Sequence, residues 1–301
     1  GYYESSDGST YFVQDFGYYP SHAGQMTATP TATPTPTPTS TASTTAPTPS
    51  PAPSAPEATT SNTALVPLSS LPAPVASTAT APIPNVSGSK LVDSRTGGTW
   101  VPHAVNWPSF EYACQQGWAD AQDGRTDTAA KAMVSWGINA VRLPLNEDCW
   151  LGTDGSPRYG TSAGYQAAIR QWVDILNANG IVVILDLHWS GGTGADSDGQ
   201  RAMADDQTPL FWEQVSYAYS KVPSVMFDAF NEPYSRDSST LSWSCWANGG
   251  CRMPDVNDES PLNGRTFTVT GMKDVLSAIR GTGATQPVLL AGLDYATDLR
   301  D

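Results

Sequence analysis

The residues best suited to chemistry are Asn231 and Glu232, which follow directly on the apolar run of residues 225–230. A short run rich in β-branched and aromatic side chains predicts a buried strand, and Pro233 ends its ladder because proline has no N–H to donate. Catalytic groups of barrel enzymes stand at the C-terminal ends of buried parallel strands. Glu232 is therefore predicted to be a general acid/base; the alternative is a carboxylate that caps the next helix.

Polar residues also stand at the C-terminal ends of three earlier predicted strands. They are Asn106 with Trp107 on the first strand, Arg142 on the second and His188 on the third. Because the C-terminal ends of parallel strands lie at one end of a barrel, these residues predict a shared site with Glu232. The alternatives are a structural ion pair for Arg142 and a hydrogen-bonded core histidine for His188.

The elements that must position these residues alternate between strand and helix. The predicted strands are residues 99–107, 138–144, 181–188, 225–232 and 287–292. The predicted helices are residues 126–136, 165–176, 210–222 and 267–279. Gly137 and Gly180 follow the first two helices at the position typical of a C-cap. This alternation predicts βαβ units and a parallel sheet with five strands.

The charge of the chain restricts its partners. The 301 residues carry a formal net charge of −14 and a pI of about 4.4, and no basic cluster occurs. Nucleic acid and anionic membrane surfaces are therefore poor candidates, and no segment is long and apolar enough to span a membrane. A neutral ligand such as an uncharged polysaccharide fits better.

The four cysteines predict two disulfides. Cys245 and Cys251 flank a turn-rich segment that could bring them together, and Cys114 and Cys149 would then pair by elimination. An even count beside an extracellular type of linker favours disulfides, and the alternative is four buried free thiols. Without CxxC spacing and with only three histidines, no zinc site or other metal site is expected.

Three regions follow one another along the chain. Residues 1–26 are rich in Tyr and Phe, which indicates either the remnant of an upstream β-rich module, such as a carbohydrate-binding module, or a disordered tail. Residues 27–85 are rich in Thr, Pro, Ser and Ala, which predicts a disordered linker. Residues 86–301 are the predicted folded domain. Because the chain begins at Gly1 without Met or a signal peptide, we expect a processed or partial sequence.

The ordered strand-end motifs resemble those of the family 5 glycoside hydrolases over residues 90–301. The motifs are Val105-Asn106-Trp107, Arg142-Leu143-Pro144, Asp186-Leu187-His188 and Asn231-Glu232-Pro233. The resemblance implies an α/β fold, a (β/α)8 TIM barrel, in a secreted enzyme that needs no cofactor. It also implies hydrolysis of a β-1,4-linked glucan with retention of configuration, by a monomer with an appended carbohydrate-binding module. A β-mannanase, another β-glucanase or a non-catalytic polysaccharide-binding barrel are the alternatives.

The resemblance also implies roles for individual residues. Glu232 would protonate the leaving oxygen and Asn231 would hydrogen-bond the sugar 2-hydroxyl. Arg142 would hold the nucleophile carboxylate, and His188 would line the subsite at the cleavage point. The candidates for substrate binding are Asn106, Trp107 and Trp189, the two tryptophans by stacking on sugar faces unless they are core residues.

One part of the family pattern has no match in this sequence. The family nucleophile is a glutamate at the end of the seventh strand, and only five strands are predicted here. We therefore expect residues 86–301 to be a catalytic domain that is incomplete at its C-terminus, with about five βα units. We also expect this part alone to be inactive, because a retaining glycosidase needs a second carboxylate about 5–5.5 Å from its acid/base.

Overall fold

The computed structural model describes residues 2–4, 10–12, 74, 80–116, 124–153, 161–192, 194, 196–235, 241–256 and 261–299, with the backbone alone for 2–4, 10–12, 255–256 and 261–265. The chain forms two compact units, Gly1–Leu65 and Val66–Asp301. In the first unit, β1 (Tyr2–Glu4) pairs antiparallel with β2 (Thr10–Phe12). The predicted linker lies outside the described residues as far as residue 79, apart from residue 74, and stays a prediction, as does the nature of residues 1–26.

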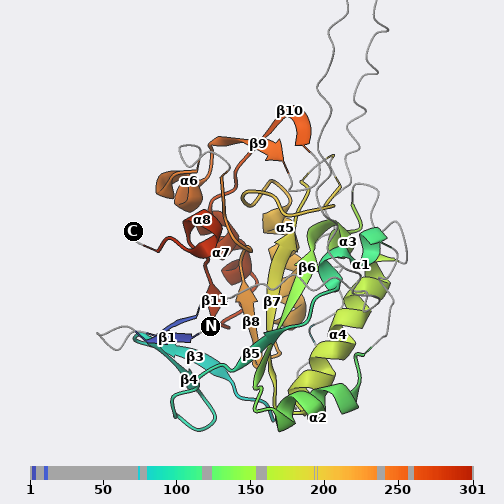
Figure 1. The fold of residues 1–301 in the computed structure, drawn as a ribbon, viewed down its shortest axis with the longest axis vertical. Helices are drawn as coiled ribbons and strands as arrows, with labels where there is room; N and C mark the ends of the chain where they lie inside the picture. The colour runs from blue at the N-terminus through green and yellow to red at the C-terminus, as the bar shows by residue number, and fades with distance from the viewer. Residues whose placement is uncertain are drawn as a thin grey trace, which may run out of the picture. The chain divides into compact units, whose positions relative to one another are not determined.

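The second unit is built on a five-stranded parallel sheet (Figure 1). Its strands are β5 (Ala104–Asn106), β6 (Ala140–Asn146), β7 (Val182–Trp189), β8 (Val225–Asp228) and β11 (Val288–Leu289). They lie side by side in chain order, each parallel to the next. This is the arrangement of five consecutive βα units of a (β/α)8 barrel, and it confirms the predicted fold class.

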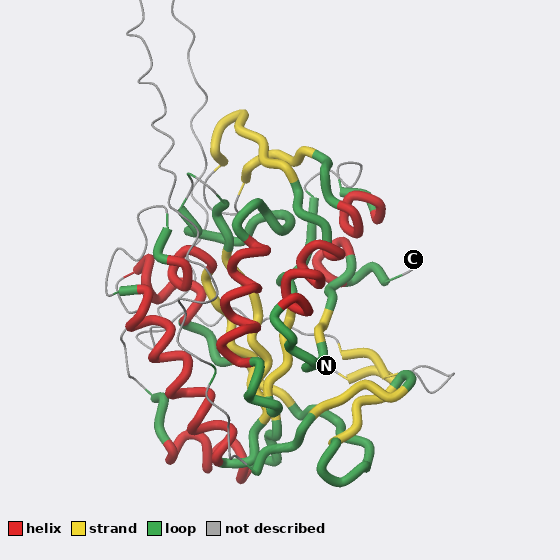
Figure 2. Tube along the Cα trace, turned by 180° about the vertical axis from the view of Figure 1, so that it is seen from behind, coloured by secondary structure: helices red, strands yellow, loops and turns green. Residues whose placement is uncertain are grey.

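The longer helices cover one face of the sheet, as the view from behind shows (Figure 2), and along the chain helices follow the strands. They are α1 (Phe110–Gln116), α2 (Asp127–Ser135), α3 (Glu147–Leu151), α4 (Ser162–Ala178), α5 (Thr208–Tyr219), α6 (Trp243–Asn248), α7 (Met272–Gly281) and the short α8 (Leu293–Ala296). The Thr126 side chain accepts a hydrogen bond from the Ala129 N–H and so caps α2. Beyond α2 and α4, Gly137 and Gly180 both adopt φ 81°, a left-handed conformation that suits glycine. The predicted ends of these two helices are confirmed within two residues.

Alternation along the strands separates the core from the site. Successive side chains of a strand point to opposite faces of the sheet. The face toward the helices is fully buried and aliphatic, with Val141, Leu143, Leu145, Val183, Leu185 and Leu187. The opposite face begins with a small apolar cluster of Trp100, Ala140, Val182, Ile184 and Met226. Further along the same face, toward the C-terminal ends of the strands, the side chains become polar.

In the second unit, two antiparallel hairpins among the described residues were not predicted. They are β3 (Pro84–Ser87) with β4 (Lys90–Asp93), and β9 (Arg252–Val256) with β10 (Pro261–Thr268). Phe267, expected in a helix, pairs with Met253 in the second hairpin, and α7 begins only after Gly271. The start predicted for this helix was wrong because a strand with β-branched neighbours precedes it.

The predicted disulfides are confirmed. Cys114 of α1 is bonded to Cys149 of α3, 35 residues away, and Cys245 of α6 is bonded to Cys251 just before β9. The first bridge joins the segments that follow β5 and β6. None of the helices in the described part of the chain has both the length and the apolar composition needed to cross a membrane.

Candidate active site

The strand register places the predicted polar residues on one face of the sheet. Asn106 of β5 pairs with Arg142 of β6, and Asp186 of β7 pairs with Asp228 of β8. Paired residues of parallel strands point to the same face, and Arg142 and Asp186 both have the parity of that face. The backbone geometry alone therefore gathers a guanidinium and two carboxylates.

Arg142 is the centre of this group. Its Nε donates to Asp228 Oδ2 at 2.9 Å, and its Nη2 lies 2.9 Å from Asp186 Oδ1. Nη2 also donates to Asn231 Oδ1 at 2.9 Å. Burial opposes the charge of Arg142, yet Asp186, Asp228 and, more weakly, Glu232 outweigh it and raise the pKa of the guanidinium. Arg142 therefore joins β6, β7 and β8 as a permanent cation.

The segment after β8 carries Asn231 and Glu232 to the edge of the sheet. Although β8 ends at Asp228, the Ala229 N–H donates to the Leu289 carbonyl at 3.0 Å and the Asn231 N–H to the Leu187 carbonyl at 2.9 Å. Asn231 is buried, whereas Glu232 is half-buried and adopts a left-handed φ of 44°. Residues 231–235 include no helix, so within the described residues Glu232 does not cap one.

His188 is tied to the same network through Asp186. Its Nδ1 lies 2.7 Å from Asp186 Oδ2, and 18% of its side chain is exposed. A further carboxylate, Glu111 of α1, is buried nearby and accepts a hydrogen bond from the Ser109 N–H at 2.7 Å. Burial raises the pKa of Glu111 to about 6, with His188 acting in the opposite direction. The end of β7 thus combines an imidazole with two carboxylates.

Burial also affects the carboxylate of Asp228. It raises the pKa of Asp228 to about 6, although Arg142 opposes this shift. Within the described residues, no group of three or more His, Cys, Asp or Glu side chains is arranged to hold a metal ion. The cation that pairs with Asp186 and Asp228 is Arg142.

The predicted aromatic residues are placed differently from one another. Trp107 packs against Trp172 of α4, with ring centroids 4.8 Å apart. Since Trp107 follows Asn106 by one residue, it points to the helix side of the sheet, and this packing favours the alternative of a core residue. Trp189 is half-buried, and its ring centroid lies 5.9 Å from that of Tyr112. Asn106 is half-buried and in register with Arg142.

Four residues of the network were not among the predicted site residues. Asp186, Asp228 and Glu111 are described above, and Gln200, from the loop after β7, hydrogen-bonds Asn231. The one available sequence signal is a charged residue within an otherwise apolar strand, and it applies to Asp186 and Asp228. For Gln200 and Glu111 the linear sequence contains no comparable signal, because loop and helix residues reach the site only through the fold.

A second acidic cluster lies in the protein interior. Glu147 of α3 accepts a hydrogen bond from Thr208 Oγ1 at 2.9 Å, and Arg201 Nη1 lies 3.2 Å from Asp205 Oδ2. Glu147 and Asp205 are both fully buried. Burial and the charge of Asp205 raise the pKa of Glu147 well above its usual value. The hydrogen bond between Glu147 and Thr208 connects α3 to the start of α5, so we assign this cluster a structural role.

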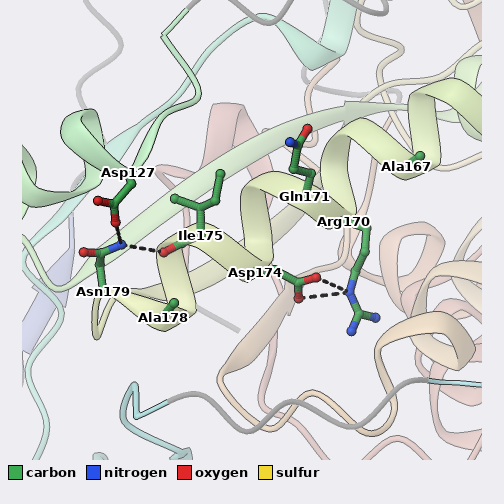
Figure 3. A pocket seen from close by; sticks show the side chains of 8 residues that line it. All are labelled: Asp127, Ala167, Arg170, Gln171, Asp174, Ile175, Ala178 and Asn179. Carbon is green, nitrogen blue, oxygen red and sulfur yellow. Dashed lines mark hydrogen bonds and ion pairs between the residues drawn. The ribbon is translucent and has the colours of Figure 1, made fainter.

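A surface hollow of about 610 Å³ lies elsewhere, along α4 (Figure 3). Its lining comes from α2 and α4, and an ion pair between Arg170 Nε and Asp174 Oδ1, at 3.0 Å, forms part of it. None of the strand-end residues lines this hollow. It is a groove on the helical side of the fold and has no part in the site.

The comparisons with known proteins agree with this architecture. Residues 96–301 match the family model of cellulase (glycosyl hydrolase family 5). The structure is similar to the crystal structure of the native β-glucanase SdGluc5_26A from Saccharophagus degradans, with 21% identity and a TM-score of 0.51, covering 78% of this chain and 62% of that one. The complex of that β-glucanase with cellotetraose gives 22% identity and a TM-score of 0.51, covering 76% and 61%. The chain thus spans less than two thirds of these structures, and no curated protein matches it.

Proposed function

This chain belongs to the cellulase family, glycosyl hydrolase family 5, and from that premise we propose that its protein hydrolyses β-1,4-linked glucan with retention of configuration. The observation that supports this function best is the bond between Arg142 and Asn231 at 2.9 Å, beside Glu232. It joins the second and fourth strand ends of the family pattern in one buried network.

In the proposed reaction Glu232 is the acid/base. It donates its proton to the leaving glycosidic oxygen and later removes one from the attacking water. Asn231 donates a hydrogen bond to the sugar 2-hydroxyl, and this bond strengthens as positive charge develops on the ring. Arg142, held by Asp186 and Asp228, supplies a fixed positive charge for the nucleophile carboxylate and keeps it ionised.

The nucleophile itself has no counterpart in the described strands. Asp186 and Asp228 lie on the site face, but both are engaged by Arg142 and Asp186 also by His188. They are therefore assigned to holding Arg142 and His188 in place. The family nucleophile belongs to a seventh strand, so we expect residues 1–301 alone to be inactive on polysaccharide.

The protein is proposed to act outside the cell. Its two disulfides support an oxidising compartment, and its substrate would be a polymer too large to enter a cell. His188, at the third strand end, is proposed to line the subsite at the cleavage point, with Trp189 beside it. Trp107 is not included in this set because it packs on Trp172.

The test compares the E232A variant of the full-length protein with wild type. On carboxymethylcellulose, activity should fall by roughly 10²–10⁴-fold, because the alcohol leaving group needs protonation. On an aryl cellobioside with a good leaving group, the first step should proceed, and azide should restore turnover by replacing the base-activated water. The matched control is E213A on α5, which removes a half-buried glutamate away from the strand ends.

Three outcomes would contradict the proposed function. Near-normal hydrolysis of carboxymethylcellulose by E232A would remove Glu232 from its role. A preference of the wild type for mannan over glucan would change the substrate. Robust hydrolysis by residues 1–301 alone would show that the nucleophile lies within them.

A further inference from the structure

The side chain of Gln200 makes three hydrogen bonds to the Asn231–Glu232 segment. Its Nε2 donates to the carbonyl oxygens of Asn231 and Glu232, both at 2.9 Å. Its Oε1 accepts from Asn231 Nδ2 at 2.7 Å. We propose that Gln200 is a positioning residue, whose amide fixes the orientation of the Asn231 side chain and the backbone conformation at Glu232.

The two ends of this network determine the orientation of both amides. A guanidinium can only donate, so Arg142 Nη2 requires the oxygen of the Asn231 side chain. Backbone carbonyls can only accept, so they require the nitrogen of Gln200. The remaining bond, from Asn231 Nδ2 to Gln200 Oε1, satisfies both constraints at once. If the Asn231 amide rotated by half a turn, its nitrogen would face a guanidinium and its oxygen would face another oxygen.

Gln200 also stabilises an unusual backbone conformation. Glu232 has φ 44°, a left-handed value that residues with a Cβ adopt at a cost and keep only when surrounding contacts hold them. The hydrogen bonds from Gln200 to the carbonyls of Asn231 and Glu232 are such contacts. The loop that carries Gln200 is anchored in turn, since the Tyr234 hydroxyl donates to the Gln200 carbonyl at 3.1 Å and the Tyr234 N–H to the Ala202 carbonyl at 3.0 Å.

This inference rests on the proposed function and deepens it. If Asn231 donates to the sugar 2-hydroxyl, it needs an N–H directed at the sugar. Gln200 and Arg142 together set which edge of the Asn231 amide carries the nitrogen. Gln200 would thereby align both the 2-hydroxyl donor and the proton donor without touching the substrate.

The chain offers a matched control for removal of this amide. Gln286 is buried, and its Nε2 likewise donates to two backbone carbonyls, those of Tyr219 at 2.8 Å and Val222 at 3.2 Å. These bonds lie before β8 and β11, at the end of the sheet opposite to the site. Q200A and Q286A therefore each remove a pair of hydrogen bonds to backbone carbonyls, one pair at the site and one pair far from it, and Q200A also removes the bond from Asn231 Nδ2.

The first readout is the kinetic effect of the 2-hydroxyl in the full-length protein. In wild type, kcat/KM for an aryl cellobioside should exceed that for its 2-deoxy analogue. Q200A should lower kcat/KM for the 2-hydroxyl substrate by about tenfold or more, mainly through kcat, and should affect the 2-deoxy analogue much less. Q286A should leave this ratio unchanged. A ratio that is the same in Q200A as in wild type would overturn the inference.

The second readout is the pH profile of Q200E. A protonated glutamic acid has nearly the shape of glutamine and can donate its O–H to a backbone carbonyl, whereas the carboxylate would repel both carbonyls. Activity of Q200E relative to wild type should therefore be highest in acid and should fall as pH rises. Thermal melts at each pH show that the variant is folded. A profile parallel to that of wild type would contradict the assigned role.

A third readout does not depend on activity. In ¹⁵N NMR spectra, the Asn231 side-chain NH₂ should give a slowly exchanging pair of signals in wild type and Q286A, and this protection should be lost in Q200A. Retention of the signals in Q200A would refute the inference. If wild type hydrolyses no glycoside while these NMR differences appear, the proposed function fails and the positioning role of Gln200 stands.

Discussion

Removal of the Cys114–Cys149 disulfide should destabilise the protein more than removal of the Cys245–Cys251 disulfide. A cross-link stabilises the folded state mainly by restricting the unfolded chain, and its effect grows with the logarithm of the loop that it closes. The two bridges close loops of 35 and 6 residues. The loop-entropy relation gives about 3.8 kcal/mol for the first and about 2.2 kcal/mol for the second at 25 °C.

The difference of about 1.6 kcal/mol between the bridges depends on the loop lengths alone. At about 2–4 °C per kcal/mol for a domain of this size, C114A/C149A should melt about 3–6 °C below C245A/C251A. Alanine is preferred to serine because a buried hydroxyl without a partner would add its own cost. Circular dichroism melts of the two double variants in the full-length protein measure the effect.

The opposite order of melting temperatures would refute the reasoning from loop entropy. Equal melting temperatures would also contradict it, since they would mean that local packing around the sulfur atoms decides the outcome. Cys114 and Cys149 are fully buried, Cys245 is nearly so and Cys251 is half-buried. The loss of packing is therefore no smaller in C114A/C149A than in C245A/C251A, and it acts in the same direction as the loop entropy.

Two predictions concern buried carboxyls whose pKa values are raised in the folded state, so that each contributes stability at low pH that is lost as pH rises. For Glu111, with a folded pKa of about 6 against an ordinary 4.5, about 2 kcal/mol should be lost between pH 4.5 and 6. The unfolding free energy of E111Q, measured with urea, should not show this loss. If E111Q and wild type had the same pH dependence of the unfolding free energy, Glu111 would not be the group responsible. E147Q should lose less stability than wild type as pH rises above 4.5, the ordinary pKa of a glutamate, because burial and Asp205 raise the pKa of Glu147 in the folded protein. The control E213Q should show the pH dependence of wild type, and an unchanged pH dependence of stability in E147Q would exclude Glu147 as its source.

The fold could be predicted from the sequence wherever one physical signal was strong. The strands β6, β7 and β8 are near-continuous apolar runs, as expected for parallel strands buried on both faces. The ends of α2 and α4 were predictable because Gly137 and Gly180 have no Cβ to oppose a left-handed conformation. The hairpin that contains Phe267 was not predictable, because its strands depend on each other for pairing and carry no clear alternation.

The site could be predicted only as far as it belongs to strand ends. Arg142, His188, Asn231 and Glu232 stand where a barrel places its functional groups, so their positions follow from the strands. Gln200 reaches Asn231 across 31 residues from a loop, and no local pattern encodes such a contact. The orientation of Trp107 depends on its parity relative to Asn106, which requires the exact limits of a strand that is only three residues long.

The alternation of core and site residues along single strands has a consequence for how this sequence can change over time. In β6, Val141 and Leu143 serve the interior while Arg142, between them, serves the site. Insertion of a single residue upstream within that strand would exchange the two sets, so that the guanidinium enters the hydrocarbon layer and a leucine replaces it among the carboxylates. Gain or loss of residues should therefore be tolerated only in the connections, whereas point substitutions can alter the two faces independently.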